Sequence, residues 1–453
     1  MAHHPAEGIP DRLLMWHRVR EYAVPRSMIE KATALRVGGD WAGACAAARV
    51  DVDLDLHAVR ERHGTEIATR IRADLRRLAP DLLRWHMPRV APDGRLRPGL
   101  TLCLARYGSA APRLVVRTPP LRADAGQRIS LALWEASGDG GAGHHPHPYP
   151  DRRFRLDLHR HLWDAGRSAE LAPRCGIGDT GSWASSRWAA EAELLLRAED
   201  RDPRGAFTVR LGPREHAVFT LVAPDDSHVP DLAPLREPLP RQEVAALPVL
   251  PEAAARALPD LALLRAGLLT PDRLHPLVAA ALAPYAPAPE ADVPNTGPGD
   301  PHRVECRGEI HRIALRDGRL TAVDHDDGQL RREELLVALG GPPLPCLRAI
   351  DAAHRSPEAL PAVRERLLHG DVSGALGAVE GLLGPRALLR DGPLREELES
   401  AAERRIAHGI YRSGLCDEHP AAAGHRPRLD RGVPHALRYR RGGRARPRTG
   451  QAR

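Results

Sequence analysis

The sequence predicts a multidomain α+β protein, and three observations support this fold class. Short apolar runs separated by turn residues, typical of β-hairpins, occur in the middle and C-terminal parts of the chain. Apolar residues with helical spacing dominate the N-terminal part and return near the C-terminus. At 453 residues, with 42% hydrophobic residues, the chain is long enough for about three domains of ordinary size. We therefore expect a helical N-terminal domain, a β-rich middle domain, and a C-terminal unit that combines a β-hairpin with helical hairpins.

Composition and periodicity divide the chain into seven segments. We expect a disordered stretch at 1–12, a helical domain at 13–92, a β-rich domain at 93–225, a short-helix region at 226–283, a Pro-rich linker at 284–303, an α+β unit at 304–416 and a disordered basic tail at 417–453. The linker is rich in proline and glycine, a composition that cannot bury a core.

The N-terminal domain contains an acidic stretch between predicted helices. Helices are expected from Met28 to Val37, from Trp41 to Arg49 and from Leu54 to Trp85. The stretch Asp51-Val52-Asp53-Leu54-Asp55-Leu56-His57 alternates, so as a strand it places three carboxylates and a histidine on one face, as in a divalent-cation site. The alternative, which we favour, is that Asp53 or Asp55 caps the following helix.

The middle domain is predicted from short runs bounded by Pro and Gly. The expected strands are Leu100–Tyr107, Arg113–Arg117, Arg128–Glu135, Arg153–His159, Ala206–Leu211 and Ala217–Val222. The last two flank Gly212-Pro213-Arg214-Glu215 and predict a hairpin, with a helix from Trp183 to Asp200 before it.

The C-terminal unit begins with a hairpin and continues as helices. Asp317-Gly318 lies between the apolar runs Glu309–Leu315 and Leu320–Val323, and glycine supplies the positive φ that a tight turn needs. Helices are expected at Leu330–Leu339, Leu347–His354, Ala359–His369, Ala375–Leu383 and Pro393–Arg412.

One turn occurs twice, at Gly39–Ala44 and at Gly370–Ala375. In both, glycine ends one helix and aspartate caps the next. The turn resembles that of tetratricopeptide-like helical hairpins over about six residues in each case, without a repeat of about 34 residues. The resemblance implies helical hairpins, with Gly370 in the left-handed conformation and Gly374 where two helices cross.

Two glycine-rich stretches were considered as phosphate sites. Gly138–Gly143 is followed by histidines and prolines and not by a helix, so we predict a loop. Gly176–Gly181 leads into a helix near Ser185, but no strand precedes it, and we favour an ordinary helix-entry loop. The single lysine, Lys31, has no glycine-rich loop before it, which excludes a Walker motif.

Histidines and cysteines offer several metal-ligand candidates. The groups considered are His144, His145 and His147; His159 and His161; and Cys306 with His311 together with Cys416 and His419, which form a zinc quartet if the two ends of the C-terminal unit meet. His63 and Glu66 share a helix face, which fits a helix surface as readily as acid–base chemistry. Because buried cysteines and surface histidines explain these groups more simply, we predict no metal and no cofactor, and the sequence identifies no catalytic or cofactor-binding residue.

Charge and cysteine usage indicate the compartment. The net charge is +7. The positively charged residues are almost all arginine, a composition that GC-rich coding produces. The six cysteines are scattered, without a Cys-x-x-Cys pair, and no long apolar segment is present. We expect a cytoplasmic protein with free thiols and no membrane contact. The cysteines are Cys45, Cys103, Cys175, Cys306, Cys346 and Cys416.

The leading functional hypothesis is a protein-interaction or scaffold module with a protein partner, because helical hairpins and a sheet domain are predicted and no catalytic constellation is. The first alternative is a nucleic-acid-associated protein that uses the basic tail, with Arg438–Arg446 on phosphates and Tyr439 stacked on a base. The second alternative is a metal-dependent enzyme with Cys/His or Asp/His chemistry.

Overall fold

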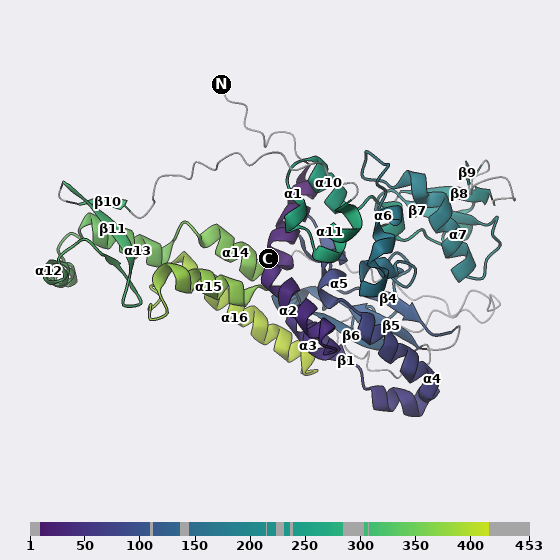
Figure 1. Ribbon diagram of the computed structural model, residues 1–453, viewed down its shortest axis with the longest axis horizontal. Coiled ribbons are helices and arrows are strands. Elements are labelled where there is room, and N and C mark those ends of the chain that lie inside the picture. The colour runs from purple at the N-terminus through teal and green to yellow at the C-terminus, as the bar shows by residue number, and fades with distance from the viewer. Residues whose placement is uncertain are drawn as a thin grey trace, which may run out of the picture.

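The computed structural model divides into a globular body, residues 10–283, and a projecting arm, residues 303–415 (Figure 1). It describes residues 10–108, 112–135, 145–213, 215–222, 231–235, 239–283, 303–306 and 308–415. The multidomain α+β class is confirmed. The predicted linker up to residue 302 and the predicted tail from 417 onward lie outside the described residues.

The N-terminal helices form one side of the body. They are α1 (Asp11–Arg18), continued by the π-turn η1 (Val19–Ala23), and α2 (Arg26–Val37), α3 (Trp41–Ala47), α4 (Leu56–Arg77) and α5 (Pro80–His86). The helix expected from Leu54 to Trp85 is therefore interrupted twice, first within α4 at Gly64, which has φ 85° and ψ 167°, and then between α4 and α5. Leu78 leaves the helical conformation, with ψ 122°, and Pro80 begins the next helix because proline suits a first helical turn.

A four-stranded sheet lies against these helices. It contains β1 (Val50–Asp53), β4 (Thr101–Arg106), β5 (Arg113–Arg117) and β6 (Ile129–Trp134) in the order β1-β6-β5-β4. β1 is parallel to β6, with Val50 opposite Ile129, and the other pairs are antiparallel. The first part of the acidic stretch, up to Asp53, thus belongs to an edge strand of the body sheet. The alternating sequence suggested a strand, but it did not indicate the strand with which it pairs.

The rest of the body is built from short elements. They are the ribbon β2 (Arg89–Val90) and β3 (Arg95–Leu96), the sheet β7 (Ala206–Arg210), β8 (His216–Val222) and β9 (Asp231–Pro234), the helices α6 (Leu171–Arg174), α7 (Trp188–Ala198), α8 (Arg241–Val244), α9 (Glu252–Ala255), α10 (Pro259–Arg265) and α11 (Pro276–Leu282), and the short helices η2 (Leu121–Ala123), η3 (Ala125–Gln127), η4 (Arg160–Leu162), η5 (Ala165–Glu170), η6 (Ser185–Arg187) and η7 (Pro271–Arg273). The β7–β8 hairpin and the α7 helix were predicted and are confirmed.

The strand expected at Arg153–His159 does not form. Successive tight turns occupy this stretch instead: the amides of Leu158 and His159 donate to the carbonyls three residues earlier. Only Arg155 pairs with the sheet, as an isolated bridge to Cys103, and its guanidinium bonds the carboxylate of Asp157.

One hydrophobic core joins most of the body. It runs from Val19 to Leu282 and includes the fully buried Trp85 and Trp163. A smaller cluster packs α7 against β7–β9 around Phe207. The N-terminal helices and the four-stranded sheet therefore share their buried surface.

The arm begins with the three-stranded sheet β10 (Arg303–Cys306), β11 (Glu309–Arg316) and β12 (Arg319–Ala322), followed by α12 (Asp327–Ala338), α13 (Pro345–Arg355), α14 (Leu360–Leu368), α15 (Val372–Leu383) and α16 (Pro393–Arg412). The predicted hairpin turn is confirmed, with positive φ at both Asp317 and Gly318. β10 was not predicted as a strand. Figure 1 shows α12 and β10–β12 at the end of the arm far from the body, and α14–α16 leading back to it.

The repeated turn has the predicted geometry at both sites. Gly39 has φ +85° and Gly370 has φ +79°, and the aspartate after each caps the next helix. A Cβ at Gly374 would lie 2.1 Å from the capping carboxylate of Asp371 and 2.8 Å from Nη1 of Arg366 on α14. The absence of a side chain at this glycine therefore leaves room for the cap and for a side chain of the neighbouring helix.

Candidate metal centre

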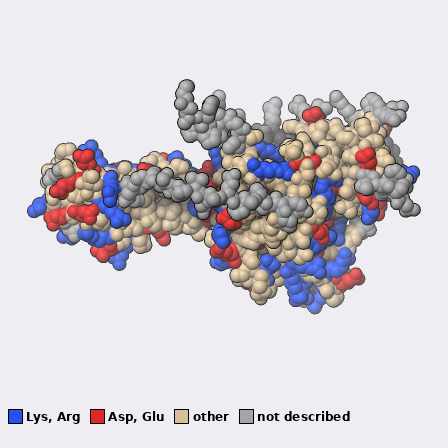
Figure 2. All heavy atoms as spheres, turned by 45° about the horizontal axis from the view of Figure 1, so that its top comes forward, with Lys and Arg blue, Asp and Glu red and all other residues tan. Residues whose placement is uncertain are grey.

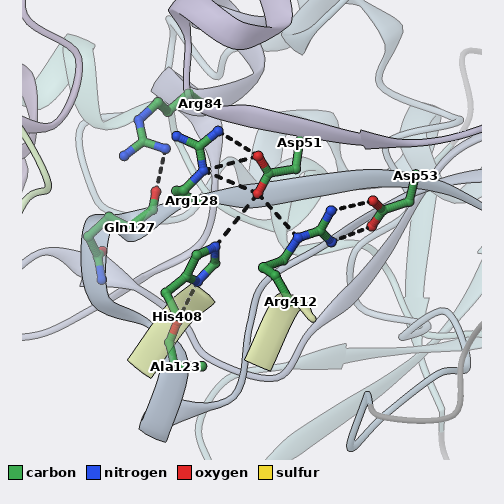
Figure 3. A network of polar contacts seen from close by, with 8 residues as sticks. All are labelled: Asp51, Asp53, Arg84, Ala123, Gln127, Arg128, His408 and Arg412. Carbon is green, nitrogen blue, oxygen red and sulfur yellow. Dashed lines mark hydrogen bonds and ion pairs between the residues drawn. The ribbon is translucent and has the colours of Figure 1, made fainter. Parts of the chain in front are cut away.

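The carboxylates of the acidic strand are held in ion pairs that attach the arm to the body (Figure 3). The Arg128 guanidinium donates to Asp51, with 2.5 Å between Nη2 and Oδ1. From α16, Nη1 and Nη2 of Arg412 donate to the two oxygens of Asp53, at 2.6 and 2.5 Å. His408, also on α16, places Nε2 3.7 Å from Asp51. β1 therefore forms part of the body–arm junction.

These contacts set the electrostatics of the strand and argue against a cation site there. Burial alone would raise the pKa of Asp51, but hydrogen bonds with His408 and Arg128 outweigh it and hold that pKa well below its usual value. Asp55 accepts hydrogen bonds from the backbone amides of His57 and Ala58, at 2.8 and 3.3 Å. The cap interpretation is therefore confirmed for Asp55.

Among the residues that the structure describes, the histidines of the middle domain do not form a metal cluster. His145 is buried, with Nε2 2.9 Å from the Thr118 carbonyl oxygen, and His144 lies outside the described residues. His159 and His161 are neighbours with ring centroids 5.8 Å apart. Nε2 of His159 lies 3.1 Å from the Glu191 carboxylate, so this nitrogen is already engaged.

The second glycine stretch holds its own carboxylate where a phosphate would bind. Asp179 accepts hydrogen bonds from the backbone amide and the hydroxyl of Ser186, at 3.2 and 2.6 Å. An anionic side chain at this helix entry leaves no need for a ligand. The loop interpretation of Gly176–Gly181 agrees with this geometry, and Gly138–Gly143 lies outside the described residues.

His63 pairs across the fold and not along its helix. Its Nε2 lies 3.0 Å from Glu135, at the end of β6, while Glu66 is exposed. The pair joins α4 to the sheet, so it has a structural explanation.

Cys306, His325 and Cys346 converge in the outer part of the arm. The two Sγ atoms and one imidazole nitrogen lie within 4.8 Å of one another, and all three residues are buried. In a tetrahedral zinc site, with Zn–S distances of about 2.3 Å and Zn–N distances of about 2.0 Å, the ligand atoms lie about 3.3–3.8 Å apart. The cluster therefore needs only small side-chain adjustments to hold such an ion.

The strands and helix of the outer arm position each of these three ligands. Cys306 is the last residue of β10, opposite Glu309 of β11. After β12 the chain turns back at once, with the His325 amide donating to the Ala322 carbonyl oxygen at 3.2 Å. Pro345 begins α13 and puts Cys346 in its first turn, where the positive helix end favours a thiolate.

His311 lies beside this cluster, outside the group of three whose ligand atoms are within 4.8 Å of one another, and is the candidate for a fourth ligand. It faces Val304 across the sheet, so it lies on the same side as Cys306, two residues along. Its ring centroid is 4.5 Å from that of His325. Its Nδ1 is buried and has no hydrogen-bond partner, which a metal ion would provide. The four residues form a Cys₂His₂ set, the composition of many structural zinc sites.

The centre is small and mostly apolar. Among the described residues, Ala322 and Leu330 are buried together with the two cysteines, and the partly buried Val304, Leu344 and Leu347 pack against them. Burial, and next the Cys306 thiol beside it, raise the pKa of Cys346 to about 11, so without a metal the thiol stays protonated at neutral pH. A bound cation replaces that proton.

The sequence pointed to half of this centre. Cys306 and His311 were considered together, but with Cys416 and His419, both of which lie outside the described residues. His325 and Cys346 were not considered, because each stands alone in the sequence without a neighbouring ligand at a recognisable spacing. Only the folding of β10–β12 against α13 brings them together.

The three described cysteines outside this centre are ordinary buried thiols. Cys45, Cys103 and Cys175 are free and lie in the body, consistent with the predicted thiols. Burial raises the pKa of Cys45 and of Cys103 to about 12. Among the helices that the structure describes, none is long and apolar enough to cross a membrane.

No family model, curated protein or solved structure matches this chain. Functional inference therefore rests on the geometry of the molecule.

Proposed function

We propose that the protein is a protein-interaction module in which a zinc ion orders the free end of the arm and α12 carries the contact surface. The observation that supports this most is the Cys306–His325–Cys346 cluster, which lies beside a helix whose leucines face solvent.

α12 has two apolar faces, and within the described part of the chain only one of them is buried. Leu330 is buried, and Val337, two turns later on the same side, is half-buried. At about 100° per residue, Leu335, Leu336 and Leu339 lie on the opposite side. They are 64%, 48% and 86% exposed. An exposed leucine row on a short helix is costly unless a partner covers it.

A metal explains how so small a unit keeps its shape. The core around the two cysteines is only a few side chains, too little for an isolated module of this size. A structural zinc site supplies the missing folding free energy directly. With His311 as the fourth ligand, the proposed site would have no open position for a substrate, and this favours the interaction hypothesis over the metal-dependent enzyme.

The surface of α12 indicates the chemistry of its partner. Arg332, Leu335, Leu336 and Leu339 follow the i, i+3, i+4, i+7 spacing of helices that bind in apolar grooves. Arg332 is exposed, and its guanidinium comes no nearer than 4.0 Å to Asp326. The proposed partner is a protein with an apolar groove that has an acidic side chain at one end.

The surface charge gives the nucleic-acid alternative no added support. On the face drawn in Figure 2, acidic and basic side chains are interspersed over both arm and body. Residues 438–446 lie outside the described residues. The interaction hypothesis is therefore the one that specific described residues favour.

The metal part of the proposal is tested by elemental analysis of the purified full-length chain. We expect one zinc per chain, and its loss in Cys306→Ser and in Cys346→Ser. Cys175→Ser is the matched control, a buried free thiol in the body, and should keep the metal. A chain that binds no zinc after reconstitution, or variants that keep it, would refute the centre.

The interaction part is tested by a photo-crosslinking amino acid at position 339 in the native host. We expect a defined protein adduct that is absent with the same group at Leu388, which is equally exposed but lies on another part of the arm. The purified adduct protein should bind the wild-type chain and lose affinity for Leu335→Glu. Equal adducts at both positions, or binding that Leu335→Glu leaves unchanged, would contradict the role of α12.

A further inference from the structure

The body contains a pocket, separate from the arm, with a volume of about 120 Å³. It opens between α1, the end of α5, β4, the turns at 154–162, α6 and the segment 252–259. One water needs about 10–15 Å³ of such a volume, so the pocket has room for about eight to twelve water-sized groups. This corresponds to a ligand of about eight to twelve non-hydrogen atoms. None of its lining residues belongs to the metal centre or to the body–arm junction.

The walls of the pocket are apolar and aromatic. Trp16, Leu102, Phe154, Leu156 and Leu162 contribute to it. Such a lining buries an apolar ligand body, and the few polar groups in it determine orientation and specificity.

Three of the five arginines in the lining are already neutralised. Arg20 forms a fully buried pair with Asp260, at 2.7 Å. Arg174 pairs with Glu191 at 2.6 Å, and Arg155 pairs with Asp157 at 2.8 Å. These three ion pairs connect the elements that form the pocket walls, and a carboxylate balances the charge of each guanidinium.

Arg12 and Arg256 are different. Among the described residues, neither guanidinium has a hydrogen bond or an ion pair, although Arg256 stacks 4.2 Å above the Trp183 ring. Burial, and then the proximity of Arg12, lower the pKa of Arg256. Glu252, the one carboxylate in the lining, only partly offsets this for both arginines. Two like charges therefore share a partly dehydrated rim with one opposing charge.

Three uncharged polar groups complete the lining. Nε1 of Trp16 and Nε2 of His86 are buried without a hydrogen-bond partner. Nδ1 of His86 lies 3.1 Å from the carbonyl oxygens of Leu82 and Leu162, so it carries the proton and Nε2 is left as an acceptor. Nδ1 of His161 lies 3.4 Å from Arg174 Nη1, a donor, so its own proton is on Nε2.

We propose that this pocket binds a small hydroxy-carboxylate with an aromatic or branched apolar body. The carboxylate lies between Arg12 and Arg256, with Trp16 Nε1–H as a further donor. The apolar body fills the space beside Phe154 and Leu156. The ligand hydroxyl donates to Nε2 of His86, the acceptor that the protein leaves unpartnered. This ligand satisfies the orphaned groups and balances the surplus charge.

The test is calorimetric titration of the full-length chain with the hydroxybenzoates, compared with the hydroxybenzamides, which share the ring and hydroxyl but carry no charge. We expect at least one hydroxybenzoate to bind, and its amide to bind at least about tenfold more weakly. Arg12→Gln and Arg256→Gln should each reduce hydroxybenzoate affinity about ten- to hundredfold. Because Arg12→Gln removes one of two repelling charges, it should not lower the melting temperature, whereas Arg256→Gln also loses the stacking on Trp183 and should lower it slightly.

Arg26→Gln is the matched control. Arg26 lies on α2, its side chain is 79% exposed, and it pairs only with Glu30. Its substitution should leave hydroxybenzoate binding unchanged. The proposal fails if no hydroxybenzoate binds, if the amides bind equally well, or if Arg26→Gln weakens binding as much as the pocket variants. None of these results depends on the zinc site or on α12.

Discussion

At the scale of single residues, Gly370 shows how a local signal acquires a long-range role. Its φ of +79° was expected from the turn it makes after α14. The structure adds a second constraint, since a Cβ at this position would lie 2.2 Å from the carbonyl oxygen of Gly126 in the body. Gly370 therefore both ends a helix and lets the arm backbone touch η3.

We predict that Gly370→Ala lowers the free energy of unfolding by at least about 2 kcal/mol, because strain of the left-handed backbone adds to the clash with Gly126. Gly377→Ala on α15 is the control. Nothing lies within 4 Å of its added Cβ, so it should gain about 0.5–1 kcal/mol. Urea unfolding of the full chain measures both. If Gly370→Ala has the same free energy of unfolding as the wild type, the arm backbone does not come this close to Gly126.

At the scale of elements, the two copies of the repeated turn are alike locally and differ in surroundings. Asp40 caps α3 by accepting from the Gly43 amide at 2.8 Å, and Asp371 caps α15 by accepting from Gly374 at 3.2 Å. Asp40 is exposed, whereas Asp371 is buried and also binds Arg49 of the body at 3.0 Å. The same six-residue pattern thus serves once as a simple cap and once as part of the junction.

This difference predicts unequal effects of the same substitution. Asp40→Ala should cost about 1 kcal/mol, the usual value of a helix cap. Asp371→Ala should cost about 3–5 kcal/mol, because it also leaves the largely buried Arg49 without its carboxylate. Denaturant midpoints of the two variants decide the matter. Equal losses would mean that the Arg49 contact contributes nothing to the junction.

At the scale of the whole molecule, several buried histidines make stability depend on pH. Burial lowers the pKa of His86 and of His145 from 6.5 to about 4. At the junction, burial and the neighbouring arginines, Arg89 first, lower the pKa of His369 to about 3. All three are therefore neutral in the folded chain at neutral pH.

The sign of the pH effect follows from proton linkage. Between about pH 6.5 and pH 4 the unfolded histidines bind protons that the folded ones do not, so stability falls as the pH falls through this window. Each histidine should cost about 2 kcal/mol at pH 5 relative to pH 7.5. We predict that the urea concentration at the unfolding midpoint falls clearly from pH 7.5 to pH 5, and that it falls less for His145→Gln. A stability that is constant from pH 7.5 to 5 would show that these rings are not buried in the neutral form.

The sequence by itself determined the elements whose signals are local. The tight turn at Asp317-Gly318, the β7–β8 hairpin, the caps at Asp40 and Asp371 and the bounds of α16 were all predicted and are confirmed. Each depends on residues within a few positions of one another, because glycine conformation, capping and proline placement act over a single turn.

Only the tertiary structure decided which distant residues meet. The parallel pairing of β1 with β6, the grouping of Cys306 with His325 and Cys346, and the convergence of Arg12 and Arg256 on one pocket leave no local trace in the sequence. Such contacts form because distant segments bury one shared core. Many apolar residues give the same sequence pattern, so the pattern does not show which of them will pack together. The failed strand at Arg153–His159 illustrates the same limit, since alternation favoured an extended chain and the turns and ion pairs of the fold overrode it.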